Sequence, residues 1–138
     1  LARLSTVLAE RCKRAPGAIT AGLAAMWDKI KAKVTLAQAA VLSGASGAEP
    51  ATKEERAFLA AHPELAVRAT GSYLGHGAEP QFVMNVALAA VALGHARLFP
   101  PCDSTGLERP MAGDLHQVVV TGVGHWRGEG LALVEAAG

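Results

Sequence analysis

Cysteine is scarce in this chain of 138 residues, and its two cysteines, Cys12 and Cys102, stand far apart. The sequence contains no CxxC pair, no HExxH pattern and no other paired histidine or cysteine spacing, so it predicts no metal site. No basic segment followed by a short apolar stretch opens the chain, so we expect neither a secretory signal nor a disulfide framework. These absences favour a protein of the reducing cytoplasm.

The chain also has few aromatic residues and a small net charge. The chain has three phenylalanines, two tryptophans and one tyrosine, and its net charge is +1. Nucleic-acid-binding surfaces combine strong positive charge with aromatic rings that stack on bases, so we expect no nucleic acid partner. The longest uncharged hydrophobic run, Pro80 to Ala96, contains Asn85 and is shorter than the roughly 20 apolar residues of a membrane span. We therefore expect a core helix there and no membrane span.

Apolar residues are abundant: they make up 51% of the chain, enough for the core of one domain. Helical spacing of apolar side chains predicts a helix from about Gly17 to Lys33. The Ser/Thr-x-x-Glu form of Thr52 to Glu55 is typical of a capping box, so a second helix is expected from there to about His62. The third predicted helix runs from Glu79 to His95.

Strands are expected where short apolar or β-branched runs are bounded by turn-forming residues. These runs are Gln38 to Ala45, Leu65 to Ala69, His116 to Thr121 and Leu131 to Ala136, with a short extended segment at Leu98 to Pro101. The order of helices and strands predicts an α/β fold with a mixed sheet covered by helices. Because the first predicted element is a helix, we expect the strand that usually precedes it to lie outside this chain.

His76 is the strongest candidate for a chemical role. It follows the strand Leu65 to Ala69 and the glycine-containing turn Thr70 to Gly75, at the start of the long apolar helix. The positive end of a helix dipole disfavours an imidazolium, so we expect a neutral ring that donates a hydrogen bond to an oxygen gaining charge. Three other histidines fall near the ends of predicted elements, which explains them structurally: His62, His95 and His116.

The segment Gly122 to Gly130 is rich in glycine, contains His125 and joins the last two predicted strands. A strand followed by Gly-x-Gly is also found in dinucleotide-binding proteins, but that fingerprint continues into a helix, whereas Leu131 to Ala136 is a predicted strand. A hairpin whose small residues let a backbone or a ligand approach closely is the better interpretation. We expect no bound cofactor.

Four landmarks occur in an order and at a spacing that resemble one enzyme family. Arg14 to Gly17 and its helix match a Pro-x-x-Gly helix, and Ala40 to Pro50 matches a strand and loop that usually read Asn-Ala-His-Gly-Thr-x-Thr-Pro. Ser72 to His76 matches Lys-Ser-x-x-Gly-His, and Val123 to Gly128 falls on a Phe-Gly-Phe-Gly-Gly-Thr loop. The whole chain thus resembles the C-terminal half of β-ketoacyl-acyl carrier protein synthases, condensing enzymes with the thiolase-like fold.

The resemblance implies roles for three residues. In that family a cysteine of the N-terminal half takes the acyl chain, and two histidines hydrogen-bond the malonyl thioester oxygen so that decarboxylation yields a stabilised enolate. His76 matches the second histidine and would be catalytic. Gly124 and His125 would bind substrate, since His125 stands where a phenylalanine often gates the acyl pocket. Neither a metal nor a cofactor is implied.

The chain also departs from the family pattern. The first histidine's position falls at about Ala45, and the lysine five residues before the second histidine falls on Gly71. The usual Gly-Ala-Ala-Gly after that histidine reads Glu79 to Phe82, and neither Cys12 nor Cys102 matches the nucleophile. Removing one oxyanion donor typically costs about 100- to 1,000-fold in rate, so a site with one histidine should condense slowly unless another donor replaces the missing one.

Three hypotheses follow from the resemblance. The first is that residues 1 to 138 are the C-terminal domain of a divergent β-ketoacyl synthase in fatty acid or related acyl-chain elongation, with the nucleophile half absent from this chain. Acyl carrier protein thioesters would be its substrates, and a homodimer, or a heterodimer with another ketosynthase, its assembly. The second is a non-catalytic subunit that pairs with an active synthase, and the third is an acyl-thioester-binding module without turnover. A lone half should expose a large apolar face and self-associate.

Overall fold

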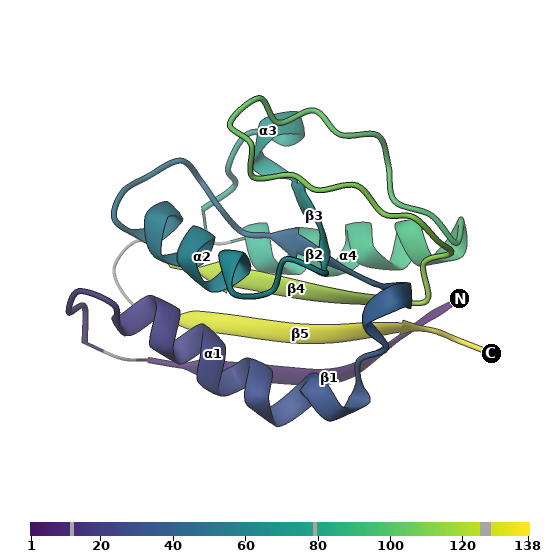
Figure 1. The fold of residues 1–138 in the computed structure, drawn as a ribbon, viewed down its shortest axis with the longest axis horizontal. Coiled ribbons are helices and arrows are strands. Elements are labelled where there is room, and N and C mark those ends of the chain that lie inside the picture. Colours follow the sequence, from purple (N-terminus) through teal and green to yellow (C-terminus); the bar gives the residue numbers. More distant parts are fainter. Residues whose placement is uncertain (12, 79, 125–127) are drawn as a thin grey trace.

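A five-stranded mixed sheet forms the centre of the molecule (Figure 1). The computed structural model describes residues 1–138 except 12, 79 and 125–127. The strands are β1 (Ala2–Glu10), β2 (Ala39–Ser43), β3 (Ala66–Ala69), β4 (Gln117–Val123) and β5 (Glu129–Ala136). Their order across the sheet is β1-β5-β4-β2-β3. Strands β4, β2 and β3 run parallel, whereas β5 is antiparallel to both of its neighbours.

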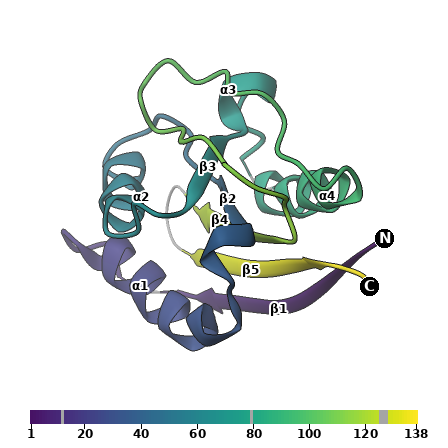
Figure 2. The ribbon, with the colours of Figure 1, turned by 45° about the vertical axis from the view of Figure 1, so that its right-hand side comes forward.

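Helices cover both faces of this sheet (Figure 2). They are α1 (Ala18–Ile30), α2 (Ala51–Ala60), the one-turn α3 (Gly71–Leu74) and α4 (Gln81–Gly94), with short 3₁₀ turns at Lys31–Lys33 and Leu36–Gln38. Helices α1 and α2 pack with Val41, Val119 and Leu133 of the sheet. Helix α4 packs on the alternate residues of the same strands, such as Leu42 and Val120. The predicted α/β architecture, a mixed sheet covered by helices, is confirmed.

The central strands are buried on both faces because a helical layer lies on each side. All residues of β2 and β3 are buried, including both the residues that face α1 and α2 and those that face α4. Strands enclosed in this way have continuous apolar sequences rather than alternating ones. This is why short apolar runs identified β2, β3, β4 and β5 in the sequence.

The expectation that the first strand lies outside the chain is wrong, because β1 precedes α1. β1 pairs with β5 from Ala2 opposite Ala136 to Glu10 opposite Glu129, with an irregularity between Leu4 and Thr6. Such an irregularity interrupts the two-residue alternation of side chains. β1 is also an edge strand, and its Leu4 remains 49% exposed. The strand therefore lacks the regular hydrophobic pattern that reveals the others.

The capping-box prediction is also wrong in detail. Helix α2 begins at Ala51, after Pro50, and no side chain caps it, so Thr52 lies inside its first turn. The neighbouring Glu54 binds a different helix: its carboxylate accepts hydrogen bonds from the backbone N–H groups at the start of α1. Glu54, which lies inside the predicted capping pattern, thus serves a tertiary contact instead of capping its own helix.

The segment Leu98 to Pro101 is not part of the sheet. The Nε of Arg68 donates to the carbonyl oxygen of Phe99 at 2.8 Å, and the two prolines that follow have no N–H to donate. The chain instead returns to β3 through a single bridge between Val67 and Arg109. Across the described residues, no helix is long and apolar enough to cross a membrane.

Candidate functional site

The sequence landmarks converge at one edge of the sheet, the edge that the carboxyl ends of its parallel strands form. Strands β2, β3 and β4 are parallel, so the loops that follow Ser43, Ala69 and Val123 leave from the same edge. β5 starts at that edge and β1 ends there, since Glu10 pairs with Glu129. The two chain termini lie at the opposite end of the sheet (Figure 1). In sheets of this kind, ligands bind beyond the carboxyl ends of the parallel strands.

A cavity of about 370 Å³ opens at this edge and brings two predicted site residues together. His76 and Gly124 both line it, although 48 positions of sequence separate them. The loop before α4, the first turn of α4 and the ends of β4 and β5 supply the rest of the wall: Ala78, Gln81, Phe82, Gly122, Val123, Gly128, Glu129 and Gly130. His125, the third predicted site residue, lies outside the described residues.

His76 lies between β3 and α4, as the sequence predicts, but α4 begins only at Gln81, five residues later, and the turn before His76 is helical. Residues 71–74 form α3, whose Tyr73 packs edge-on against Phe99 with ring centroids 5.3 Å apart. Gly75 then ends α3 with a φ of 72°, a left-handed conformation that favours glycine. His76 follows as a half-buried residue, and its Nδ1 is buried.

A pair of glycines shapes the floor of the cavity. Gly122 on β4 and Gly130 on β5 are direct cross-strand partners. A Cβ at Gly122 would lie 2.7 Å from the ring of Phe82, and one at Gly130 would lie 3.2 Å from it. The Phe82 side chain therefore occupies a slot that exists because both strands carry glycine at this register. A larger residue at either position would displace the ring.

Buried amides and a hydroxyl link α4 to the ends of β2 and β3. Asn85 is fully buried, and its Nδ2 donates to the carbonyl oxygen of Ser43 at 3.2 Å. Its Oδ1 accepts from the Thr70 hydroxyl at 2.6 Å and from Gln81 Nε2 at 3.1 Å. Gln81 Oε1 in turn accepts from the backbone N–H of Gly77 at 2.8 Å. This network, here called the amide network, ends beside His76.

Glu55 is buried behind the same edge. One carboxylate oxygen accepts hydrogen bonds from the Ser43 hydroxyl at 2.9 Å, the Gly44 N–H at 3.2 Å and the Thr121 hydroxyl. Its other oxygen is buried and has no hydrogen-bond partner among the described residues. Burial raises the pKa of Glu55, while the hydrogen bonds from Thr121, Ser43 and Gly44 act to lower it.

Arg14, which follows β1, binds residues at the same edge. Its guanidinium donates to the carboxylate of Glu129 and to the carbonyl oxygen of Gly124. Glu129 is buried, and it also lines the cavity. The Arg14 to Gly17 landmark therefore fixes the backbone of the glycine-rich loop at one of the predicted substrate-binding residues.

Two of the departures from the family pattern, Gly71 and the segment around Ala45, lie against each other. A Cβ added at Gly71 would lie 3.0 Å from the carbonyl oxygen of Ala45, closer than most Cβ contacts. The loop after β2 is itself held against β4, since a Cβ at Gly44 would lie 2.7 Å from the carbonyl oxygen of Thr121. The backbone around Ala45 is thus packed against a glycine at position 71.

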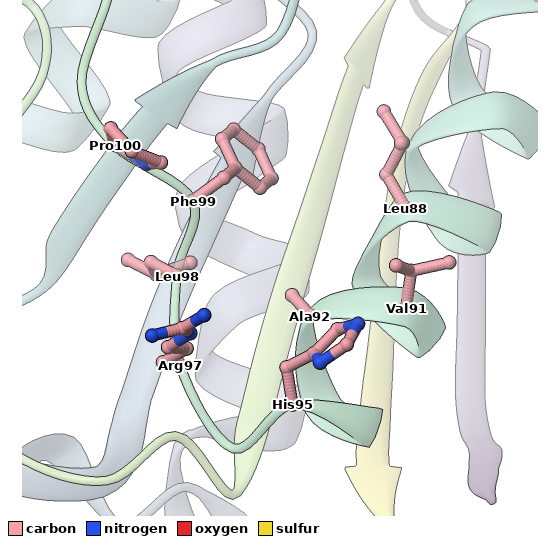
Figure 3. A pocket seen from close by; sticks show the side chains of 8 residues that line it. All are labelled: Leu88, Val91, Ala92, His95, Arg97, Leu98, Phe99 and Pro100. Carbon is pink, nitrogen blue, oxygen red and sulfur yellow. The ribbon is translucent and has the colours of Figure 1, made fainter.

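A second cavity, of about 360 Å³, lies between the end of α4 and the segment that follows it (Figure 3). Leu88, Val91 and Phe99 form apolar walls, and the exposed side chains of His95 and Arg97 stand at one end. An apolar cavity of about 260 Å³ adjoins it, because Leu88 and Phe99 line both. These two cavities lie along the later turns of α4, whereas the cavity lined by His76 and Gly124 lies at the N-terminal end of α4.

Sequence patterns did not identify Glu55, Gln81 or Asn85 as site residues. A polar residue inside the apolar run of α4 was a signal for Asn85, since buried amides require hydrogen-bond partners. Glu55 was hidden because the capping pattern gave it a local explanation. Within the described part of the chain, no cluster of three or more histidine, cysteine, aspartate or glutamate residues is arranged to hold a metal ion.

Comparison with known proteins identifies the fold. No family model matches the sequence, and no curated protein matches it. Among solved structures, the chain is similar to the oxazolomycin ketosynthase domain of Streptomyces albus JA3453, with a TM-score of 0.70 and 16% identity. The match covers 98% of this chain and 44% of that domain. The chain therefore has a thiolase-like, ketosynthase-like fold and spans less than half of the solved domain.

Proposed function

We propose that this chain is the C-terminal half of a divergent β-ketoacyl synthase that elongates fatty acyl or related acyl chains. One observation carries the proposal: His76 and Gly124, which the motif resemblance assigned to catalysis and substrate binding, line one cavity. The ketosynthase-like fold supports it independently, because the structural comparison uses the backbone whereas the motif resemblance uses the sequence. The cavity lies at the carboxyl ends of the parallel strands, which is where ligands usually bind in such sheets.

The proposed chemistry is decarboxylation of a malonyl thioester carried by acyl carrier protein. The bond between the α-carbon and the carboxylate breaks, CO₂ leaves, and its electron pair forms an enolate whose charge develops on the thioester oxygen. A neutral His76 ring would donate a hydrogen bond to that oxygen. The enolate carbon would then attack an acyl thioester, whose thiolate departs as the new carbon–carbon bond forms.

The surface of α4 supports the half-enzyme proposal. Helix α4 buries Gln81, Asn85 and Ala89 against the sheet, but it is apolar on its outer side too. Val83 and Val91 there are 70% and 58% exposed, with the exposed Ala87 between them. A helix that is hydrophobic all round is normally buried. We infer that the remainder of the ketosynthase, or a dimer partner, covers this stripe of Val83, Ala87 and Val91.

The direct test is malonyl thioester decarboxylation by the complete protein that contains this chain. His76→Ala should lower the rate of CO₂ release about 100- to 1,000-fold, the usual cost of losing one oxyanion donor. His116→Ala is the matched control, because His116 is exposed and precedes β4 at the end of the sheet away from the cavity. Full activity of His76→Ala would contradict the catalytic role proposed for His76.

A second candidate function is a ketosynthase-like subunit without turnover, paired with an active synthase. The contact between Gly71 and Ala45 favours it, because these positions correspond to the family's lysine and first histidine. A lysine could not be restored at position 71 without moving the Ala45 carbonyl by a few tenths of an ångström. Copurification with an intact synthase, together with no decarboxylation by the protein alone, would select this function over the first.

A further inference from the structure

We propose that Gln81 is a positioning residue for His76, acting through the backbone of the loop that carries it. This inference rests on the proposed function, which gives His76 its chemical role. The hydrogen bond from the Gly77 N–H to Gln81 Oε1, 2.8 Å long, ties the residue after His76 to the first residue of α4. Gln81 also lines the His76 cavity and is only 4% exposed.

The loop needs such a restraint because its own sequence supplies little. Gly75 and Gly77 flank His76, and glycine leaves the backbone the most conformational freedom. Ala78 has a φ of 51°, a left-handed conformation that costs a non-glycine residue energy. A strained residue persists only when its surroundings fix it. The side chain of Gln81 provides a fixed acceptor one residue before the strained position.

Gln81 is itself held at the other end of its amide. Its Nε2 donates to the Thr70 hydroxyl at 3.0 Å and to Asn85 Oδ1 at 3.1 Å, and both partners are buried. Asn85 extends the chain of hydrogen bonds to the carbonyl oxygen of Ser43 at the end of β2. The amide network therefore transmits the position of two sheet strands to the loop of His76.

The same contacts define what Gln81 does not do. Its amide group is engaged on both sides, with Oε1 accepting from Gly77 and Nε2 donating to Thr70 and Asn85. It is thus committed to the protein rather than to a substrate oxygen, and it does not replace the missing histidine.

The test combines an NMR measurement with kinetics. Gln81→Met keeps the length and volume of the side chain but removes its hydrogen bonds, and Gln38→Met at an exposed glutamine is the matched control. In Gln81→Met the Gly77 amide should exchange with solvent at least about tenfold faster, and the His76 ring resonances should shift. A misplaced catalytic group can cost about 100-fold in rate. We expect kcat for decarboxylation to fall about 10- to 100-fold, with KM changed less than about threefold.

The outcomes separate this inference from the proposed function. Unchanged Gly77 exchange and unchanged His76 ring resonances in Gln81→Met would overturn the positioning role, whatever the activity. Full activity of His76→Ala would overturn the catalytic role and leave the NMR result to be judged by itself. If Gln81→Met does not fold, the wild-type chain decides: a scalar coupling from the Gly77 amide to the Gln81 side-chain carbonyl supports the bond, and its absence contradicts it.

Discussion

Glu55 shows how a single buried side chain couples the ends of two strands. Its carboxyl group receives hydrogen bonds from the end of β2, at Ser43 and Gly44, and from Thr121 on β4. The group is only 1% exposed, so ionisation places a charge in a medium that solvates it poorly. Desolvation therefore dominates, and the pKa of Glu55 lies above its usual value of 4.5.

This raised pKa predicts a pH-dependent stability. Between about pH 4.5 and the pKa of Glu55 in the folded state, the native protein holds a proton that the unfolded chain has released. The free energy of unfolding contributed by this group should then fall by about 1.4 kcal/mol per pH unit as the pH rises. Glu55→Gln removes the titration, so its stability relative to wild type should increase with pH.

Urea denaturation of both proteins from pH 5 to pH 8 measures this difference. The Gln side chain keeps an acceptor for Ser43, Gly44 and Thr121, so the variant should fold. Glu49→Gln, at an exposed glutamate, controls for the change in net charge. Parallel stability profiles for wild type and Glu55→Gln would contradict the account of Glu55.

Single residues were predictable from the sequence to an uneven degree. The place of His76 between β3 and α4 was predictable because glycines and a long apolar helix flank it, and these features are local. The role of Glu55 depends on a partner far away in sequence, Thr121. A local pattern carries no information about such partners. For Glu55 the capping pattern gave a misleading explanation.

At the scale of elements, α1 depends on a cap supplied by α2. Gly17 precedes the helix and has no side chain, so it cannot satisfy the free N–H groups of the first turn. The Glu54 carboxylate accepts from Gly17 N at 3.0 Å, Ile19 N at 2.8 Å and Thr20 N at 3.3 Å. Its negative charge also lies at the positive end of the helix dipole. One side chain of α2 thus caps α1 and ties the two helices together.

Glu54→Ala should therefore destabilise the fold by about 1 to 2 kcal/mol, at the upper end for a lost N-cap. Glu54→Gln keeps an acceptor and loses only the charge, so its cost should be about 0.3 to 1 kcal/mol. Chemical denaturation of the two variants measures both values. Equal stability of Glu54→Ala and wild type would show that the cap contributes nothing.

Elements were predictable where their pattern followed from burial. The helix around Leu23 and the fully enclosed strand β2 match their expected positions, because each has a periodicity set by the layers around it. β1 was missed because an edge strand with an irregular register is only half enclosed. α3 was missed because its single turn is stabilised by the tertiary contact of Tyr73 with Phe99.

At the scale of the whole molecule, the outer face of α4 predicts association. The exposed stripe of Val83, Ala87 and Val91 lies on a helix whose opposite side forms part of the core. Burying one valine side chain gains roughly 1.5 kcal/mol or more, so two chains that pair through this stripe gain several kcal/mol. The chain by itself should self-associate.

Analytical ultracentrifugation tests the stripe directly. The double substitution Val83→Ser and Val91→Ser should shift the chain toward monomer, whereas Val7→Ser, at an exposed valine on β1, should not. A wild-type chain that stays monomeric at high concentration would count against the half-enzyme picture.

The most direct measurement of the central claim is the rate of CO₂ release from malonyl thioester by the complete protein, with and without His76. A condensing enzyme that uses His76 to stabilise the enolate predicts a measurable wild-type rate and a loss of about 100- to 1,000-fold in His76→Ala. An undiminished rate in that variant, with His116→Ala equal to both, would contradict it.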